Sequence, residues 1–315
     1  MSLHADAPGM LQESSSIVVF INPTAGAGRA RIYLPRIQRV FESSGILAEF
    51  VVTRSAEELG SCARDAILRG GDLLLTIGGD GTFQALANAT FGANVVLGIV
   101  PVGGGNDFAA ALGMPSDPVR AVGALLAGEA RLVDLVRVRT GDGRTRLYAA
   151  GGGIGLDAEA VRYASGAYHH LPGRIRYIAS ALTALAGFDA LNVRIDFPGS
   201  DLPSFETQAL LAAALNSPTY GAGLRLAPDA TVDDGSLAVV MIEKLSMFEI
   251  LTLLPRLMGS GELQTSRVKR WRARRVRFTT QQPCMFQGDG EILGPTPVEI
   301  EVVPKSVRVL APTVG

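Results

Sequence analysis

The chain has 315 residues, of which 47% are hydrophobic and 19% are charged, and its formal net charge at pH 7 is −1. This length and composition are typical of a globular protein with a large core and room for two ordinary domains. The near-neutral charge argues against a protein that coats nucleic acid, so no nucleic-acid partner is expected. No segment reaches the roughly 18 uncharged apolar residues of a membrane-spanning helix, so any membrane contact should be peripheral.

The beginning of the chain and its cysteines bear on where the protein works. Residues 1–15 contain neither the basic nor the apolar segment of a secretion signal, and we expect them to form a disordered tail. Cys62 and Cys284 lie far apart, and the three histidines provide no metal-ligand cluster. These features predict reduced thiols, a cytoplasmic protein and no zinc site.

From residue 16 to about residue 138, short β-branched runs alternate with segments of helical periodicity. The expected strands are 16–21, 46–53, 73–77, 95–100 and 131–138. The expected helices lie near 29–41, 56–68, 82–91 and 118–127. This alternation predicts an α/β domain over 16–138, with a parallel sheet and helices on both faces.

After residue 138 strand-like runs dominate, and the sequence GDGR at Gly141 is typical of a hairpin turn. The expected strands are 145–150, 191–197, 208–215, 236–242, 274–280, 298–303 and 306–311, with helical stretches near 172–188 and 246–257. We predict a mostly antiparallel β-sandwich over 139–311 and a cleft between the two domains. The prediction allows the C-terminal end to pack back on the first domain.

Three loops rich in glycine or asparagine follow expected strands of the parallel sheet: NPTAGAG, GGDGT and PVGGGND. Such sheets bind ligands at the carboxyl ends of their strands, so these loops should converge on one ligand. Their polar tips are Asn22, Asp80, Asn106 and Asp107.

Two common phosphate motifs are disfavoured. A Walker A loop needs a lysine beside its glycines, and the only lysines, Lys244, Lys269 and Lys305, lie elsewhere. The sequence GIGLDA from Gly153 matches a dinucleotide fingerprint, but no acidic residue follows about twenty positions later and the surroundings are not βαβ.

The loop GGDGT contains both glycines and an acid. Gly78 and Gly79 allow a sharp turn and close approach to a ligand, and Thr82 can cap the next helix. Asp80 would repel a phosphate unless a divalent cation or water lies between them, which favours a magnesium nucleotide. A simple strand-to-helix turn explains four such residues equally well, but convergence of three loops favours a ligand cradle.

Six motifs, in order, resemble the diacylglycerol kinase catalytic family of lipid kinases, which includes bacterial soluble diacylglycerol kinases and relatives of sphingosine kinases. They are NPTAGAG, GGDGT, PVGGGNDFA, the acid Asp134 in RLVDL, APDATVDDGSL and QGDGE. The resemblance extends from Ser16 to Pro312. GGDGT alone would also be shared with NAD kinases and, in a near form, with phosphofructokinases.

The resemblance implies a phosphofructokinase-like nucleotide domain followed by a β-sandwich. It implies an ATP-dependent kinase of a lipid hydroxyl, with diacylglycerol as the first-choice acceptor and phosphatidic acid as its product. The implied nucleotide contacts are Asn22, Pro23, Thr24, Gly26, Gly28, Arg29, Gly78, Gly79, Asp80, Gly81, Thr82, Gly103, Gly104, Asn106 and Asp107.

The resemblance also assigns acids. Asp289 would be the general base, with Glu291 and Asp80 as further catalytic residues. The implied magnesium network is Asp80, Asp107, Asp134 and Glu291, with a possible structural magnesium at Asp233 and Asp234. A positioned carboxylate that accepts the proton of a weakly nucleophilic hydroxyl typically contributes roughly 10²–10⁴-fold. Taken alone, QGDGE is explained as well by a hairpin turn.

Two positions depart from the family pattern. Gly104 stands where a hydroxyl residue is usual, and Ala110 stands where arginine is frequent. Arg29 or Arg31 could supply the missing charge. The departures keep open two alternatives: a kinase of a soluble acceptor such as NAD, and a non-catalytic protein that binds nucleotide or lipid.

Two segments bear on lipid contact. The basic stretch 267–277 could face a membrane with Trp271 at the interface, or it could be a solvated edge strand whose arginines prevent aggregation. The stretch 171–188 could be a core helix or a mobile apolar helix beside the cleft. The implied location is cytoplasmic with transient contact at the inner membrane surface. A homodimer remains possible.

Overall fold

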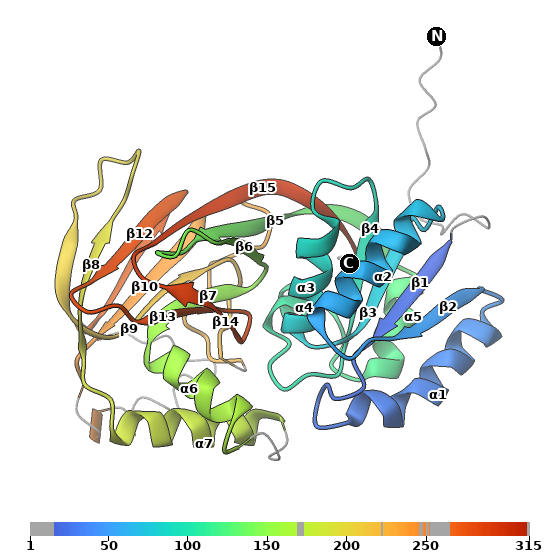
Figure 1. The fold of residues 1–315 in the computed structure, drawn as a ribbon, viewed down its shortest axis with the longest axis horizontal. Coiled ribbons are helices and arrows are strands. Elements are labelled where there is room, and N and C mark those ends of the chain that lie inside the picture. Colours follow the sequence, from blue (N-terminus) through green and yellow to red (C-terminus); the bar gives the residue numbers. More distant parts are fainter. Residues whose placement is uncertain are drawn as a thin grey trace, which may run out of the picture.

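The computed structural model describes residues 16–168, 173–221, 223–245, 248–249, 252 and 265–313. Two lobes lie side by side, and two long strands, β5 (Glu129–Arg139) and β15 (Val298–Ala311), run from one to the other (Figure 1). The expected tail, and nearly all of the helical stretch expected near 246–257, lie outside the described residues. No helix in the described part is long and apolar enough to span a bilayer.

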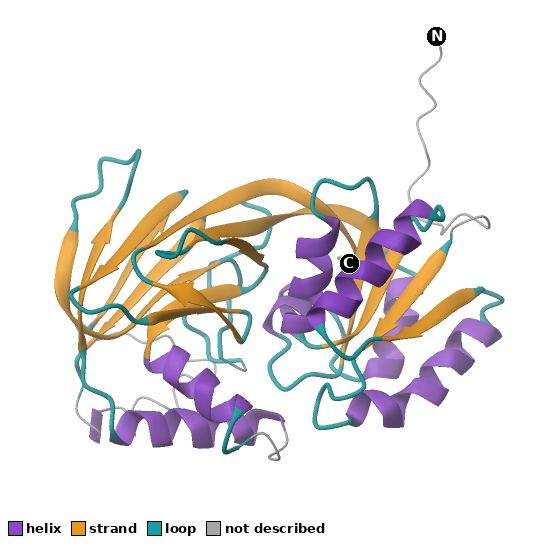
Figure 2. Cartoon of the chain, viewed as in Figure 1, coloured by secondary structure: helices purple, strands orange, loops and turns teal. Residues whose placement is uncertain are grey.

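The first lobe is the predicted α/β domain. Its parallel sheet has the order β2-β1-β3-β4, with α1 and α5 packed together on one face and α2 and α3 on the other (Figures 1 and 2). Its strands are β1 (Ile17–Ile21), β2 (Ala48–Val52), β3 (Leu73–Gly78) and β4 (Val96–Pro101). Its helices are α1 (Arg29–Ser43), α2 (Ala56–Leu68), α3 (Asp80–Thr90), α4 (Asp107–Ala111) and α5 (Pro118–Leu126). The short helix α4 was not expected.

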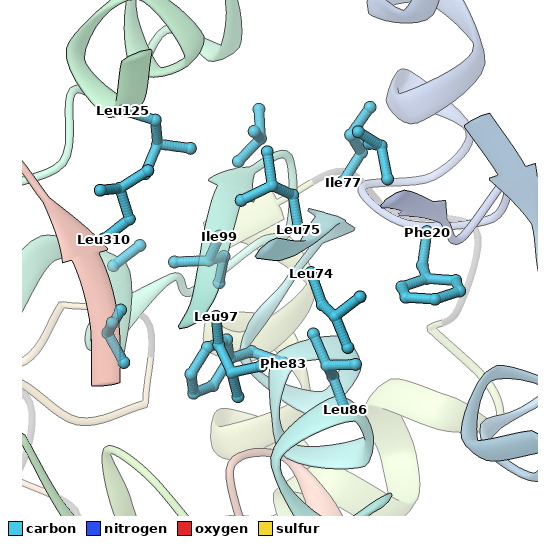
Figure 3. Close-up of a cluster of buried hydrophobic side chains, with 14 of the residues drawn as sticks. Phe20, Leu74, Leu75, Ile77, Phe83, Leu86, Leu97, Ile99, Leu125 and Leu310 are labelled. Atoms are coloured by element: carbon cyan, nitrogen blue, oxygen red, sulfur yellow. The ribbon is translucent and has the colours of Figure 1, made fainter. Parts of the chain in front are cut away.

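The core of the first lobe explains its continuous apolar strands. Every residue of β1 and β3 is buried, because helices cover both faces of the sheet. Phe83 of α3, Leu125 of α5 and Leu310 of β15 pack in the same cluster (Figure 3). The last strand of the chain therefore contributes to the core of the first lobe.

The pairing of β5 and β15 corrects two expectations. The run 131–138 was expected in the parallel sheet, but β5 pairs antiparallel with β15 and with β6 (Thr145–Tyr148). The runs 298–303 and 306–311 were expected as separate strands, but they form one strand whose register with β5 shifts between Val303 and Val307. Near its end β15 pairs parallel with β4. Pairing direction depends on distant partners, so the local pattern could not reveal it.

The second lobe is the predicted antiparallel part. Its further strands are β7 (Gly151–Gly155), β8 (Leu191–Asp196), β9 (Phe205–Leu215), β10 (Leu237–Glu243), β11 (Val268–Ala273), β12 (Arg275–Thr280), β13 (Met285–Gly288) and β14 (Glu291–Pro295). Its described helices include α6 (Leu156–Ser165) and α7 (Gly173–Ala186). All pairings between strands of this lobe are antiparallel. The sequence did not predict β7, β13, β14 or α6.

Strand β7 was missed because glycines occupy most of it. A Cβ on Gly152 would lie 2.5 Å from the Phe286 ring, so a close approach of β13 requires glycine there. β7 pairs antiparallel with β9 and β13. The GIGLDA segment is thus not part of a βαβ unit, as its rejection as a dinucleotide fingerprint supposed.

The basic stretch 267–277 forms β11 and part of β12. β11 pairs only with β10 among the described strands, so it is an edge strand. The Trp271 ring packs between Phe197 and Phe205, with centroid separations of 5.6 and 5.4 Å. Trp271 thus contacts two rings of the second lobe, and the edge-strand alternative describes the position of β11.

Candidate functional site

A cavity of about 1160 Å³ lies between the lobes. One part of its wall is polar and comes from the loops after β1, β3 and β4 and from the turn between β13 and β14. The other part is apolar and comes mainly from α6, α7, β9 and the loop before β10. Representative apolar residues are Leu156, Val161, Leu182, Leu185, Leu211 and Leu224. A single cavity thus joins a polar and an apolar compartment.

The three glycine loops converge as predicted, and their backbones touch. A Cβ on Gly26, whose φ is +61°, would lie 1.9 Å from the carbonyl oxygen of Val102. A Cβ on Gly103 would lie 2.7 Å from the Cα of Gly79. Only glycine permits these approaches, so the loops after β1 and β3 both pack against the loop after β4.

Thr82 does not cap α3, contrary to expectation. Helix α3 begins after Gly79 with no side-chain cap, and Asn22 Nδ2 donates to Thr82 Oγ1 at 3.2 Å. Asn22 Oδ1 in turn accepts from the backbone N–H of Thr24 at 3.1 Å. The asparagine thereby joins the first two loops, and the N-terminus of α3 faces the cavity, where a helix favours an anion.

Asp80 caps another helix. Its Oδ2 accepts from the backbone N–H of Asp107 at 2.8 Å, and its Oδ1 accepts from that of Phe108 at 3.2 Å. These N–H groups open α4, so the acid fixes the third loop. Burial raises the pKa of Asp80 well above its usual value, and the charges of Asp107 and Asp289 raise it further against the opposing effect of the two N–H groups.

Asp289 occupies the turn between β13 and β14 with φ of +52°. Its Oδ2 accepts from Ala149 N at 2.6 Å, and its Oδ1 accepts from Ala150 N and Gly151 N at 2.9 and 3.2 Å. Burial raises the pKa of Asp289 to about 6, although these three hydrogen bonds lower it; the charge of Asp107 adds to the rise. A carboxyl with this pKa can exchange a proton near neutral pH.

The segment QGDGE forms the hairpin turn between β13 and β14 and also places two acids, Asp289 and Glu291, in the cavity wall. The turn projects Glu291 over the first turn of α3, where a Cβ on Gly81 would lie 3.0 Å from Glu291 Oε1 and 3.5 Å from the carbonyl oxygen of Asp289. Protein atoms around Glu291 partly desolvate its carboxylate and raise its pKa, although the side chain stays exposed. The close packing explains why a glycine, Gly81, follows Asp80 in GGDGT.

Two polar side chains of α3, the buried Gln84 and the half-buried Asn88, connect the two lobes beside the acids. Gln84 Nε2 donates to the carbonyl oxygen of Gly288 at 3.0 Å. Asn88 both accepts from Leu147 N at 2.9 Å and donates to Leu147 O at 2.8 Å. Asp107, which is also buried, accepts at Oδ1 from Gly223 N at 2.9 Å. These contacts bring acids from both ends of the sequence together.

Asp134, which was expected in the catalytic magnesium network, lies apart from this group. It is fully buried and absent from the cavity wall. Its Oδ2 accepts from Gly235 N and its Oδ1 from Lys305 N, both at 2.7 Å. Asp134 therefore holds the loop before β10 and the irregular part of β15.

Some of the expected nucleotide-binding residues line the cavity and others do not. The cavity wall includes Asn22, Thr24, Gly26, Gly79, Asp80, Gly81, Thr82, Gly103, Gly104 and Asn106. It does not include Pro23, Gly28, Arg29, Gly78 or Asp107. The Arg29 guanidinium lies over the Tyr33 ring at 5.5 Å, whereas the cavity's arginines, which the sequence did not single out, are Arg54, Arg64, Arg146 and Arg176.

Three further polar residues of the cavity wall were missed. Tyr220 Oη donates to Asp157 Oδ2, and Gln287 Nε2 donates to the same carboxylate at 3.1 Å and to Tyr220 Oη. Gln287 Oε1 accepts from Gly290 N at 3.0 Å, so the group supports the Asp289 turn. Burial raises the pKa of Asp157 despite these bonds. The sequence signals were the acid in GIGLDA and the glutamine that opens QGDGE.

Comparisons with known proteins agree with these features. Residues 16–138 match the family described as "Diacylglycerol kinase catalytic domain", and residues 152–311 match that described as "YegS C-terminal NAD kinase beta sandwich-like domain". A diacylglycerol kinase of Mycobacterium tuberculosis is 26% identical over 304 residues, covering 96% of this chain and 97% of the relative. One of Bacillus subtilis is 26% identical over 297 residues, covering 93% and 95%.

A crystal structure of a diacylglycerol kinase from Bacillus anthracis superposes with a TM-score of 0.70 at 18% sequence identity, and covers 94% of this chain and 97% of that one. This likeness confirms the predicted fold class. The two matched families occupy the first and second lobes in the order that the motifs predicted. On this basis the chain belongs to the diacylglycerol kinase catalytic family.

Proposed function

We propose that this protein is an ATP-dependent kinase that phosphorylates a lipid hydroxyl, with diacylglycerol as the first-choice acceptor. The observation that carries the proposal is the single cavity of about 1160 Å³ whose polar part contains the glycine loops and acids and whose apolar part is lined by leucines. A phosphoryl donor and an acyl chain need these two environments side by side.

The polar compartment suits the phosphates of ATP. The contacting loop backbones and the N-terminus of α3 offer a close approach for an anion, and Arg54, Arg146 and Arg176 add positive charge to the wall. These arginines can take over the contact that Ala110 lacks, whereas Arg29 is engaged with Tyr33. ATP is accordingly the donor that family membership implies.

The acids at the polar compartment are suited to bind magnesium that enters together with the nucleotide. In the described part of the chain no three His, Cys, Asp or Glu side chains are grouped closely enough to hold a metal ion alone. Magnesium usually keeps several waters and is held by one or two carboxylates and by phosphates. Asp80, Asp107 and Glu291 fit this mode, because the charges of Asp107 and Asp289 raise the pKa of Asp80 and a cation would relieve that repulsion. Bound magnesium would neutralise charge that develops on the transferred phosphoryl group.

Asp289 is suited to act as the general base. Oδ1 already accepts two backbone N–H groups and Oδ2 accepts one, so Oδ2 keeps a lone pair for a proton. As the acceptor oxygen attacks the γ-phosphorus and the bond to the leaving ADP breaks, the hydroxyl proton passes to Oδ2. The backbone N–H groups hold the carboxylate in place throughout.

Incubation with γ-labelled ATP, magnesium and mixed micelles of single lipids tests the proposal. We expect label in the lipid phase with diacylglycerol, and the panel should include monoacylglycerol, ceramide and sphingosine. Asp289→Asn serves as the inactive control. Absence of lipid label from folded protein at every magnesium concentration would contradict lipid kinase activity.

A soluble acceptor is the second candidate, because the matched second-lobe family is described as NAD kinase-like. The apolar compartment disfavours this acceptor, since a dinucleotide has no acyl chain to fill it. NAD belongs in the same assay, and labelled NADP without labelled lipid would establish this alternative. Tight ATP binding with no transfer at all would establish the non-catalytic one.

A further inference from the structure

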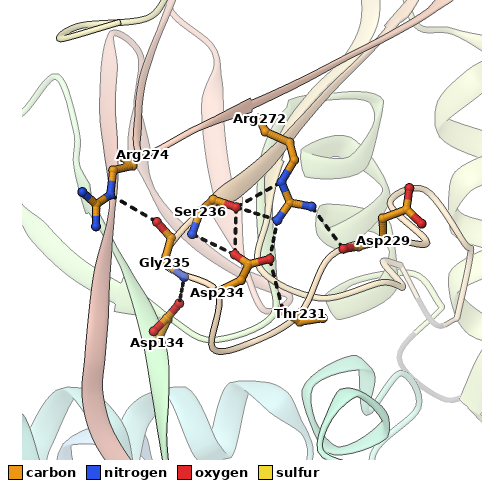
Figure 4. A network of polar contacts seen from close by, with 8 residues as sticks. All are labelled: Asp134, Asp229, Thr231, Asp234, Gly235, Ser236, Arg272 and Arg274. Atoms are coloured by element: carbon orange, nitrogen blue, oxygen red, sulfur yellow. Dashed lines mark hydrogen bonds and ion pairs between the residues drawn. The ribbon is translucent and has the colours of Figure 1, made fainter.

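Arginines of the basic edge strand β11 and of the bend after it contact the loop 226–236 of the same lobe. Arg270 and Arg272 are two residues apart on β11, so their side chains leave the same face of the strand, and Arg274 occupies the bend between β11 and β12. Each donates to a backbone carbonyl of the loop 226–236, which connects the cavity wall to β10. Figure 4 shows the contacts of Arg272 and Arg274. The acceptors are Leu226 O at 3.2 Å from Arg270 Nε, Asp229 O at 3.1 Å from Arg272 Nη1, and Gly235 O at 3.4 Å from Arg274 Nε.

The middle arginine is at the centre of a network. Arg272 Nη2 forms an ion pair with Asp234 Oδ2 and donates to Ser236 Oγ at 2.6 Å (Figure 4). Asp234 Oδ1 accepts from the N–H and hydroxyl of Ser236 at 2.9 and 2.8 Å, and Oδ2 accepts from Thr231 Oγ1 at 3.1 Å. Desolvation acts to raise the pKa of Asp234, but the bonds from Ser236, Arg272 and Thr231 hold it below its usual value.

The oxygen atoms around Arg272 are the kind that hard divalent cations collect: a carboxylate, a backbone carbonyl and a hydroxyl. Each Asp234 oxygen already accepts two donors. Asp233 is exposed. The residues therefore do not fit the structural magnesium expected at Asp233 and Asp234, because Arg272, Ser236 and Thr231 already engage both carboxylate oxygens of Asp234. The rigid fork of the Arg272 guanidinium can bind several oxygens at once, as a metal ion would.

We propose that Arg272, supported by Arg270 and Arg274, is a built-in cation that fixes the loop 226–236 in place of a structural divalent ion. Asp134 holds the same loop from the other side through Gly235 N. The loop's first residue, Leu226, lines the cavity, so the network stabilises part of the cavity wall. The proposal also accounts for the basic stretch without a membrane.

Thermal unfolding of the nucleotide-free protein tests the independence from cations. We expect the wild-type Tm to agree within about 1 °C in EDTA and in millimolar Mg²⁺ or Ca²⁺. Trp271, the only tryptophan, lies beside Arg272 in sequence and can sensitise bound Tb³⁺. We expect no Tb³⁺ emission that depends on Asp234. A Tm increase or Tb³⁺ emission present in the wild type and lost in Asp234→Asn would overturn the proposal.

The role of the arginine is tested by a matched pair of variants. Arg272→Gln should lower Tm by about 3 °C or more, because Asp234 loses its ion pair and the Asp229 carbonyl loses its donor. Arg277→Gln removes the same charge from an ion pair with Glu299 that is about half exposed, and should leave Tm nearly unchanged. Equal Tm values for the two variants would overturn the proposal. If Arg272→Gln does not fold, the wild-type cation titration decides alone.

A substitution that opens space provides a positive test. Arg272→Ser removes the guanidinium but keeps the surrounding oxygens, so Ca²⁺ or Mg²⁺ should raise its Tm and Tb³⁺ should bind near Trp271. Both effects should be at least several-fold weaker in the wild type. A Ca²⁺ effect of the same size in the wild type would show that the arginine does not replace a cation.

Discussion

The acids of the cleft and the acid of the loop before β10 have similar sequence neighbours, but folding shifts their pKa values in opposite directions. Asp80 and Asp289 line the cleft and Asp107 is buried next to Asp80; burial and the neighbouring acids raise the pKa values of Asp80 and Asp289. Asp234, in the loop before β10, lies against Arg272 and its pKa is lowered. Asp80, Asp289 and Asp234 all adjoin glycine in the sequence. The difference is the presence of a protein cation.

This difference separates function from stability. Acids that repel one another at a buried site destabilise the folded protein, and such sites are where ligands and catalysis are found. Acids that are neutralised by an arginine and by backbone N–H groups stabilise a loop and have no free capacity for a ligand. The acids of the cleft can therefore bind a cation that enters with a nucleotide. The acid of the loop 226–236 is already neutralised by the protein's own arginine and needs no added cation.

The largest expected effect comes from Asp289→Asn. We expect kcat to fall by roughly 10²–10⁴-fold with ATP binding retained, because an amide cannot accept the acceptor proton. Steady-state assays and ATP titration measure the two effects, and Tm reports on folding. Asp234→Asn is the comparison variant, and it should lower Tm while the turnover of the folded fraction is kept. Unchanged turnover in Asp289→Asn would remove Asp289 as the base.

Gly103→Ala tests whether contact between the loops matters. The added Cβ would lie 2.7 Å from the Cα of Gly79, so the second and third loops must separate. A displacement near 1 Å costs on the order of 10²-fold, and we expect that loss in kcat/KM for ATP. Gly123→Ala in α5 meets nothing within 4 Å and is the matched control, with wild-type kinetics. Equal activity in the two variants would contradict the convergence argument.

The pH dependence distinguishes the two groups of acids directly. Because the pKa of Asp289 is about 6, kcat/KM should fall about tenfold per pH unit below pH 6, and the apparent value belongs to the coupled carboxylates. The effect on stability has the opposite sign: protonated Asp289 favours the folded state, and this contribution is lost as pH rises through about 6.

Asp234 behaves differently, since its pKa is lowered. Its contribution to stability is present above the ordinary value of 3.8 and is lost only as pH falls below that value, through the folded-state pKa. Profiles of kcat/KM between pH 4 and 9, and of Tm from pH 9 down to below 3.8, measure both groups. A flat activity profile between pH 5 and 7 would show that Asp289 does not titrate there.

The smallest expected effect is that of Tyr220→Phe. Loss of the hydroxyl removes the hydrogen bonds to Asp157 and Gln287, but the direct bond between Asp157 and Gln287 at 3.1 Å can still support the turn. We expect kcat to fall by about fivefold, as for a loss near 1 kcal/mol, with KM for ATP unchanged. Gln287→Leu should have a larger effect on kcat, since it also removes the bond to Gly290. The opposite order would contradict the positioning role.

Much of the first lobe was predictable, because its elements depend on local patterns. Each parallel strand is a short apolar run that ends at a glycine loop, and each long helix has its own periodicity. The predicted meeting of the three loops is what the structure shows. The errors occurred where the pattern was weak or ambiguous: β7 consists mostly of glycine, and β5 follows α5 as a parallel strand would.

The sequence motifs identified the acidic residues, but they predicted only in part which of these acids line the cavity. Asp134 and Asp289 both stand in recognised motifs, yet the first is buried beneath a loop and the second lines the cavity. The arginines of β11 were noticed as a charged run, but their carbonyl acceptors are about 40 residues away in sequence. No local pattern contains such a pairing.

The sequence by itself determined the two-lobed α/β and β arrangement, the family and the glycine loops, since these follow from periodicity, composition and ordered motifs. Only the tertiary structure decided which acids share the cleft, that Asp80 caps α4, and that arginines neutralise the loop 226–236. The physical reason is that the charge state and role of a carboxylate depend on its burial and on the donors around it. Those donors come from segments that meet only when the chain folds.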